Sequence, residues 1–91
     1  MIALKIKIDS ERLIYKYDKE YDILDIYLGN TTVSFSDEID VGVYEYYDRD
    51  TDELLGVGIE DYKSRDKDNL NKILPFRLNF EYILKNVINN Q

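Results

Sequence analysis

Apolar residues recur at every second position in short runs as far as Tyr62 and change to helical spacing after it. Alternation of apolar and polar residues is typical of a half-buried strand. The chain begins with this pattern, because apolar residues stand at Ile2, Leu4, Ile6 and Ile8. The other strand-like runs are Leu13–Tyr17, Ile23–Leu28, Val33–Phe35, Val41–Tyr47 and Leu54–Glu60. The sequence therefore predicts an antiparallel β-meander of four to five strands.

The segment after Tyr62 begins with a short predicted helix at about 69–74. Asp68 or Asn69 can cap its first turn, because short polar side chains accept hydrogen bonds from the free amides there. Pro75 ends it, since the residue before a proline is pushed out of the helical region.

The main helix is predicted at about 79–89, with Asn79 as its N-cap. Its apolar stripe is Phe80, Ile83, Leu84, Val87 and Ile88. A helix this short is not stable alone in water, so we expect it to pack on one face of the sheet. The predicted fold class is α+β.

A chain of 91 residues buries one core, so we expect a single domain over 1–91. Its sheet core is predicted at about 13–62 and its helical segment at about 66–90. The chain contains no cysteine and no histidine, which excludes disulfides, thiolate zinc sites and histidine as a proton carrier. We therefore predict that the protein is not an enzyme and has no cofactor or metal.

The loop lengths set the register of two predicted hairpins. A four-residue loop in the first places Tyr15 opposite Leu24 and keeps the larger apolar residues on one side. In the second, Arg49–Asp52 forms the loop, which places Tyr46 opposite Leu55 and Tyr44 opposite Val57. This register puts Tyr15, Tyr17, Tyr44 and Tyr46 in the core, with their hydroxyl groups at its rim.

Acidic residues are concentrated in the middle of the chain. Residues 18–61 hold fourteen acidic residues against two basic ones, whereas 1–17 and 62–91 are both slightly basic. Such a segment repels phosphate backbones and attracts basic protein surfaces. The alternative interpretation is that these acids are only solvated turns and sheet edges.

The stretch Tyr17–Leu28, which reads YDKEYDILDIYL, resembles the opening motif of the domain of unknown function 2283 family. The acidic segment Asp37–Asp40, the strand Val43–Asp48 and the sequence Gly58–Glu60 also resemble this family. Two departures are Tyr21, where the family usually has alanine, and the absence of a turn glycine between Asp50 and Glu53.

The resemblance implies a small sheet-based domain with no established activity and no functional residues to transfer. Members of the family are often encoded beside small toxin-like proteins, so the resemblance implies an antitoxin-like binding role.

The loop that begins at Asp48 places carboxylates at alternate positions, as calcium-binding loops do at their start. It then departs from that pattern, because Glu53 stands where glycine is needed and Ile59 where a glutamate would close the site. An acidic hairpin turn is the favoured interpretation.

We predict a cytoplasmic, non-enzymatic protein-binding module that takes a basic protein partner and also forms a homodimer. We expect no membrane association and no direct binding of nucleic acid. The alternative is a mimic of nucleic acid that inhibits a DNA- or RNA-processing enzyme. The residues predicted to contact the partner are Asp48, Asp50, Asp52, Glu53, Tyr27 and Tyr47. Tyr62 is also predicted to be at a contact surface, because its neighbours in the sequence are polar.

Overall fold

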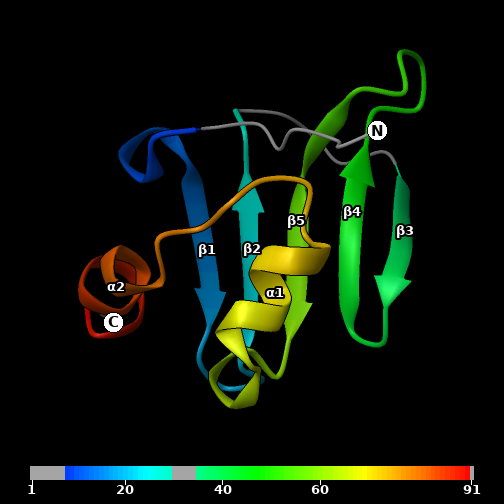
Figure 1. Cartoon of the computed structure of the whole chain (residues 1–91). Helices are drawn as coiled ribbons and strands as arrows, with labels where there is room; N and C mark the ends of the chain where they lie inside the picture. Colours follow the sequence, from blue (N-terminus) through cyan, green and yellow to red (C-terminus); the bar gives the residue numbers. More distant parts are fainter. Residues whose placement is uncertain (1–7, 30–34, 91) are drawn as a thin grey trace.

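The protein folds into one five-stranded antiparallel sheet with its helices on one side (Figure 1). This computed structural model describes residues 8–29 and 35–90. The strands are β1 (Ile14–Asp18), β2 (Ile23–Tyr27), β3 (Phe35–Asp40), β4 (Val43–Tyr47) and β5 (Leu54–Glu60). Their order in the sheet is β1-β2-β5-β4-β3, so the β3–β4–β5 meander joins the β1–β2 hairpin through β5. The predicted α+β fold is confirmed, whereas the predicted strand at the start of the chain lies almost wholly outside the described residues.

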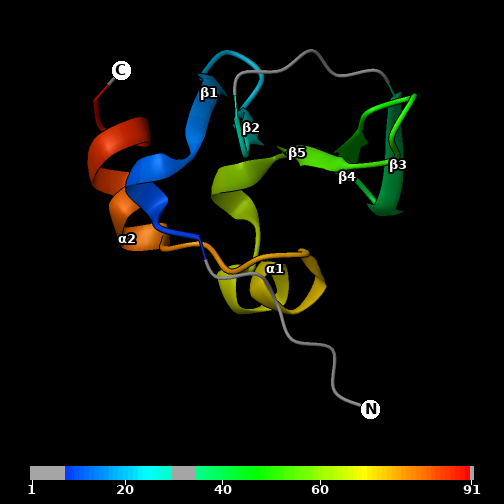
Figure 2. The same ribbon diagram turned by 90° about the horizontal axis from the view of Figure 1, so that it is seen from above.

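The helical part consists of α1 (Lys67–Ile73) and α2 (Phe80–Ile83), which continues as the π-helical turn η3 (Leu84–Ile88). Short 3-10 turns, η1 (Ser10–Arg12) and η2 (Tyr62–Ser64), precede β1 and α1. Figure 2 shows α1 and α2 on the same side of the sheet. No helix of the described part is long and apolar enough to cross a membrane.

The predicted helix ends are confirmed at Pro75 and Asn79 but not at the start of α1. Leu74 has extended backbone before Pro75, and the Asn79 side chain accepts a hydrogen bond from the Tyr82 amide at 3.0 Å. The cap of α1 is Asp66, which accepts from the amides of the next turn, so the prediction of Asp68 or Asn69 is wrong. Asp66 is favoured because it stands one residue before Lys67 with extended backbone, which is the geometry that a cap requires.

The core lies between the helices and the adjacent face of the sheet. Its fully buried members come from β2, β4, β5, α1, the α1–α2 connection and α2: Leu24, Ile26, Val43, Val57, Ile59, Leu70, Leu74, Phe76 and Ile83. The side chain of Asn71 stabilises the α1–α2 connection through two hydrogen bonds. It accepts one from the amide of Leu78 and donates one to the carbonyl of the same residue. Helix packing therefore fixes which face of each strand is buried.

The β1–β2 hairpin has the predicted faces but a register two residues away from the predicted one. Tyr15 lies opposite Ile26 and Tyr17 opposite Leu24. The loop begins one residue later than predicted, because Asp18 stays in the strand and its carboxylate accepts from the Glu20 amide. A two-residue shift leaves each side chain on its original side.

The β4–β5 register differs from the prediction by one residue, which moves two tyrosines to the other side of the sheet. Tyr44 lies opposite Gly58 and Tyr46 opposite Gly56, and the register shifts again at Tyr47. This arrangement lets Val57 and its neighbours fill the core while glycines leave space for rings on the other side. The prediction that Tyr44 and Tyr46 belong to the core below the helices is therefore wrong.

The acidic segment before β4 is itself a strand. Asp37 pairs with Glu45 and Glu38 with Tyr44, whereas the sequence predicted a strand only at residues 33–35. Of that predicted strand, only Phe35 belongs to the described residues. All of β3 except Ile39 is exposed, so packing imposes no apolar alternation on it.

We predict that Gly58→Ala destabilises the protein by about 1–3 kcal/mol, the usual cost of overpacking. A Cβ at this position would lie 1.9 Å from the Tyr46 hydroxyl oxygen and 2.9 Å from a carboxylate oxygen of Asp25. Urea unfolding measures the effect. Gly29→Ala is the control, because a Cβ there meets nothing within 4 Å, and equal losses of stability in the two variants would contradict the prediction.

Candidate functional site

The side of the sheet opposite the helices carries a mixed group of tyrosines and carboxylates. This open face comprises Asp25, Tyr27, Glu38, Tyr44, Tyr46 and Glu60. Register places them on one side, because Glu38 pairs with Tyr44, Tyr44 with Gly58, and Gly58 with Asp25. None of the described helices lies over this side (Figure 2).

Tyr46 is the central group of the open face. Its hydroxyl crosses β5 above Gly58 and donates a hydrogen bond to Oδ1 of Asp25 at 2.5 Å. Its ring stacks on Tyr27 with centroids 5.9 Å apart. Burial raises the pKa of Tyr46, and the hydrogen bond to Asp25 raises it further. Tyr46 therefore remains a neutral donor that holds the Asp25 carboxylate in place.

Tyr44 lies beside two further carboxylates of the open face. Loss of hydration raises its pKa, and the negative charges of Glu38 and Glu60 act in the same direction. Glu38 also accepts a hydrogen bond from the Gly42 amide at 3.0 Å, which fixes it at the turn between β3 and β4. The carboxylates are thus positioned by neutral hydroxyl and amide donors.

Cations are not among the partners of these carboxylates. Within the described part of the chain, the single ion pair shorter than 4.0 Å joins Arg12 and Asp9. Lys16 is opposite Asp25 in the β1–β2 register without forming such a pair. Arg65 donates instead to the backbone carbonyls of Glu60 and Val41. The open face therefore retains negative charge that this part of the chain does not neutralise.

The predicted acidic turn lies at the end of the β4–β5 hairpin. Asp48 accepts hydrogen bonds from the amides of Asp50 and Thr51, and Asp52 adopts a left-handed backbone conformation with φ of 59°. Asp50, Asp52 and Glu53 are exposed and Asp48 is half-buried. These bonds organise the turn itself. Among residues 8–29 and 35–90, no group of three or more acidic side chains is arranged to hold a metal ion.

The two predicted contact tyrosines lie on opposite sides of the sheet. Tyr27 belongs to the open face, whereas Tyr47 is on the other side, where it stacks on Phe35 and its hydroxyl donates to Glu45. Tyr62 is only 4% exposed, so its predicted place at a contact surface is wrong. It turns into the core because η2 directs it beneath α2, despite its polar neighbours in the sequence.

Sequence reasoning missed Asp25, Glu38 and Glu60 as members of one site. A signal for them exists in Gly56 and Gly58, whose spacing in a central strand leaves one side of that strand without side chains. Large side chains from neighbouring strands can then cross it. The one-residue error in register concealed this consequence.

No protein-family model, no curated protein and no solved structure matches the chain. The resemblance to the domain of unknown function 2283 family therefore stays a prediction.

We predict that the free energy of unfolding falls as pH rises from 10 to 12, in part through Tyr47. Its hydrogen bond to Glu45 raises the pKa of Tyr47 from 10.0 to about 12, and loss of hydration adds to the effect. Over this range the unfolded chain ionises Tyr47 while the folded chain keeps it neutral, so folding loses stability.

Urea unfolding at a series of pH values tests this prediction. Tyr47→Phe should lose less stability than the wild type between pH 10 and 12, and absorbance of the phenolate should show one late-titrating tyrosine fewer. An unchanged loss in the variant would show that Tyr47 does not contribute.

Proposed function

We propose that this protein is a non-enzymatic binding module whose open face takes a cationic surface of a protein partner. The observation that carries the proposal is the set of carboxylates on an uncovered side of the sheet with no ion-pair partner in the described part. A partner that supplies lysine or arginine side chains would form charge-assisted hydrogen bonds with them.

The tyrosines of the open face suit such an interface. Tyr27, Tyr44 and Tyr46 are half-buried, so their rings are already held in position before a partner arrives. Ordered aromatic rings lose little conformational entropy on binding and can also stack against arginine. The face thus combines rigid apolar surface with fixed negative charge.

The same charges favour a different protein over a second copy of this chain at the open face. Two open faces in contact would bring carboxylates together and would be destabilised by repulsion. The predicted homodimer would therefore use another surface. An antitoxin-like role agrees with this preference, because it requires a distinct partner that the acidic side can attract.

The acidic turn has a separate part in this proposal. Its exposed carboxylates extend the negative field beyond the sheet and would accelerate the approach of a basic protein. Its internal hydrogen bonds order the backbone of the turn through Asp48, but within the described part no hydrogen bond holds the exposed side chains of Asp50, Asp52 and Glu53 in position for contact. We therefore assign the contact to the open face and long-range attraction to Asp48–Glu53.

Two variants with equal charge changes test this assignment. Asp25→Asn, Glu38→Gln and Glu60→Gln together should weaken capture of the partner at least about tenfold, because contact charges contribute to both association and retention. Asp50→Asn, Asp52→Asn and Glu53→Gln remove the same charge from the turn and should mainly slow association.

Pull-down at low salt with each variant, followed by kinetic binding measurements on the recovered partner, provides the comparison. Circular dichroism verifies that both variants are folded. If the turn variant loses capture and the open-face variant retains it, the site is the turn. If neither variant differs from the wild type, charge does not carry the interaction.

A further inference from the structure

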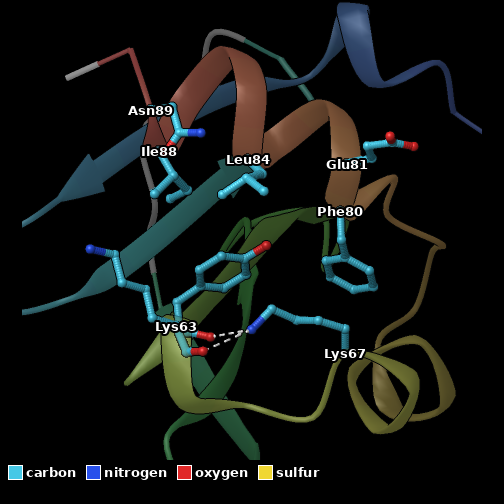
Figure 3. Close-up of a pocket in the computed structure, with 8 residues that line it drawn as sticks. Lys63, Lys67, Phe80, Glu81, Leu84, Ile88 and Asn89 are labelled. Atoms are coloured by element: carbon cyan, nitrogen blue, oxygen red, sulfur yellow. Dashed lines mark hydrogen bonds between the residues drawn. The ribbon is translucent and has the colours of Figure 1, made fainter.

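A pocket on the helical side of the molecule is separate from the open face. It has a volume of about 490 Å³ and lies between α2–η3 and the loop that leads into α1 (Figure 3). Pockets for small molecules usually have volumes of about 300–1,000 Å³. We call it the helix pocket, and it is lined by Tyr62, Lys63, Lys67, Phe80, Glu81, Leu84, Ile88 and Asn89.

One wall of the helix pocket is an apolar row that the core leaves only partly buried. The sequence predicts a single stripe along the main helix, but the structure divides it in two. Ile83 and Val87 face the core, whereas Phe80, Leu84 and Ile88 follow one another at four-residue intervals along the pocket. Leu84 is 50% exposed. A π-helical turn begins at this residue, and such turns are frequent at functional sites.

Tyr62 lines the helix pocket, and its hydroxyl has no hydrogen-bond partner among residues 8–29 and 35–90. Only 4% of the residue is exposed. No side-chain nitrogen or oxygen in that part is both buried and unpaired, so the hydroxyl retains some contact with solvent. A donor in this position can satisfy an acceptor on a bound molecule.

Lys67 gives the loop side of the pocket a positive charge, whereas the Lys63 ammonium points away from it (Figure 3). The Lys67 ammonium lies 4.4 Å from the centroid of the Tyr62 ring and donates to the carbonyls of Tyr62, Lys63 and Arg65 at 2.6, 3.4 and 2.9 Å, so it would attract an anion mainly by its charge. It has no carboxylate within 4.0 Å in the described part. In Figure 3 its ammonium points toward the backbone carbonyls of the loop, whereas the Glu81 carboxylate points away from it.

These walls differ in the chemistry that they offer. The helix side presents aliphatic and aromatic surface, and the loop side presents a hydroxyl donor together with the Lys67 ammonium, which has no carboxylate within 4.0 Å in the described part. We propose that the helix pocket binds a small amphiphilic carboxylate of the fatty-acid class. Its hydrocarbon chain lies along Phe80, Leu84 and Ile88, and its carboxylate lies on the side of Tyr62 and Lys67.

Titration of the ¹⁵N-labelled protein with sodium octanoate tests the proposal. Saturable shifts of the amides of Lys67, Leu84 and Asn89 are expected. Octylammonium has the same hydrocarbon chain and the opposite charge, so it should bind at least about tenfold more weakly if Lys67 selects an anion.

Two variants test the two walls of the pocket separately. Leu84→Glu should weaken octanoate binding about tenfold through lost apolar contact and added negative charge. Tyr62→Phe keeps the ring and should weaken binding about tenfold through the loss of a hydrogen bond to a charged acceptor. Val41→Glu is the matched control, since Val41 is 81% exposed and lies outside the pocket lining.

The proposal is overturned if octanoate shows no saturable binding or if octylammonium binds as tightly. It is also overturned if Val41→Glu weakens binding as much as Leu84→Glu. Because the open-face carboxylates remain intact in the pocket variants, loss of octanoate binding does not affect capture of a basic protein partner. Failure of either proposal can therefore be recognised independently of the other.

Discussion

Strand β5 needs large apolar side chains on one side and no side chains on the other, and the rest of the structure depends on both requirements. On the helical side, Val57 and Ile59 contribute to the core with β2 and β4 as neighbours. On the other side, Gly58 leaves space for the Tyr46 ring of β4 to lie across the strand, and Gly56 allows the backbone of β2 at Ile26 to approach closely. The core and the open face thus share one strand, and its register determines the composition of both.

Tyrosine hydroxyl groups hold carboxylates in position throughout this protein. Tyr17 donates to Asp22, Tyr46 to Asp25 and Tyr47 to Glu45. A neutral donor fixes the position of a carboxylate without neutralising it, whereas an arginine or lysine would do both. An acidic surface can in this way be ordered and still keep its charge for an external partner.

Much of the fold was predictable because period and turn chemistry are local properties. Alternation located β2, β4 and β5 to within about two residues, as such boundaries allow, and Asn79 and Pro75 marked helix ends. The location of β3 was not predictable from apolar periodicity, since almost all of it is exposed. Register in the β4–β5 hairpin depended on space above the glycines, which is a tertiary property.

The candidate site was less predictable than the fold for the same reason. Asp25 and Glu38 are thirteen positions apart in the sequence and come to lie on the same side of the sheet only through the pairing of β2, β5, β4 and β3. Tyr62 has polar neighbours in the sequence and is nevertheless buried, because η2 places it beneath α2. The sequence shows that this region is acidic, but the pairing of the strands determines which acidic side chains lie on the same surface.

The position of β5 also bears on how freely this sequence can diverge. Positions 55–59 are all buried, and each is limited by core packing on one side, or on the other side by the Tyr46 ring at Gly58 and the β2 backbone at Gly56. The exposed acids of β3 and of the turn can be exchanged for other polar residues at little cost to folding. Relatives of this chain should therefore retain the alternation of glycine with branched aliphatic residues in this strand longer than the acidic residues that dominate its composition.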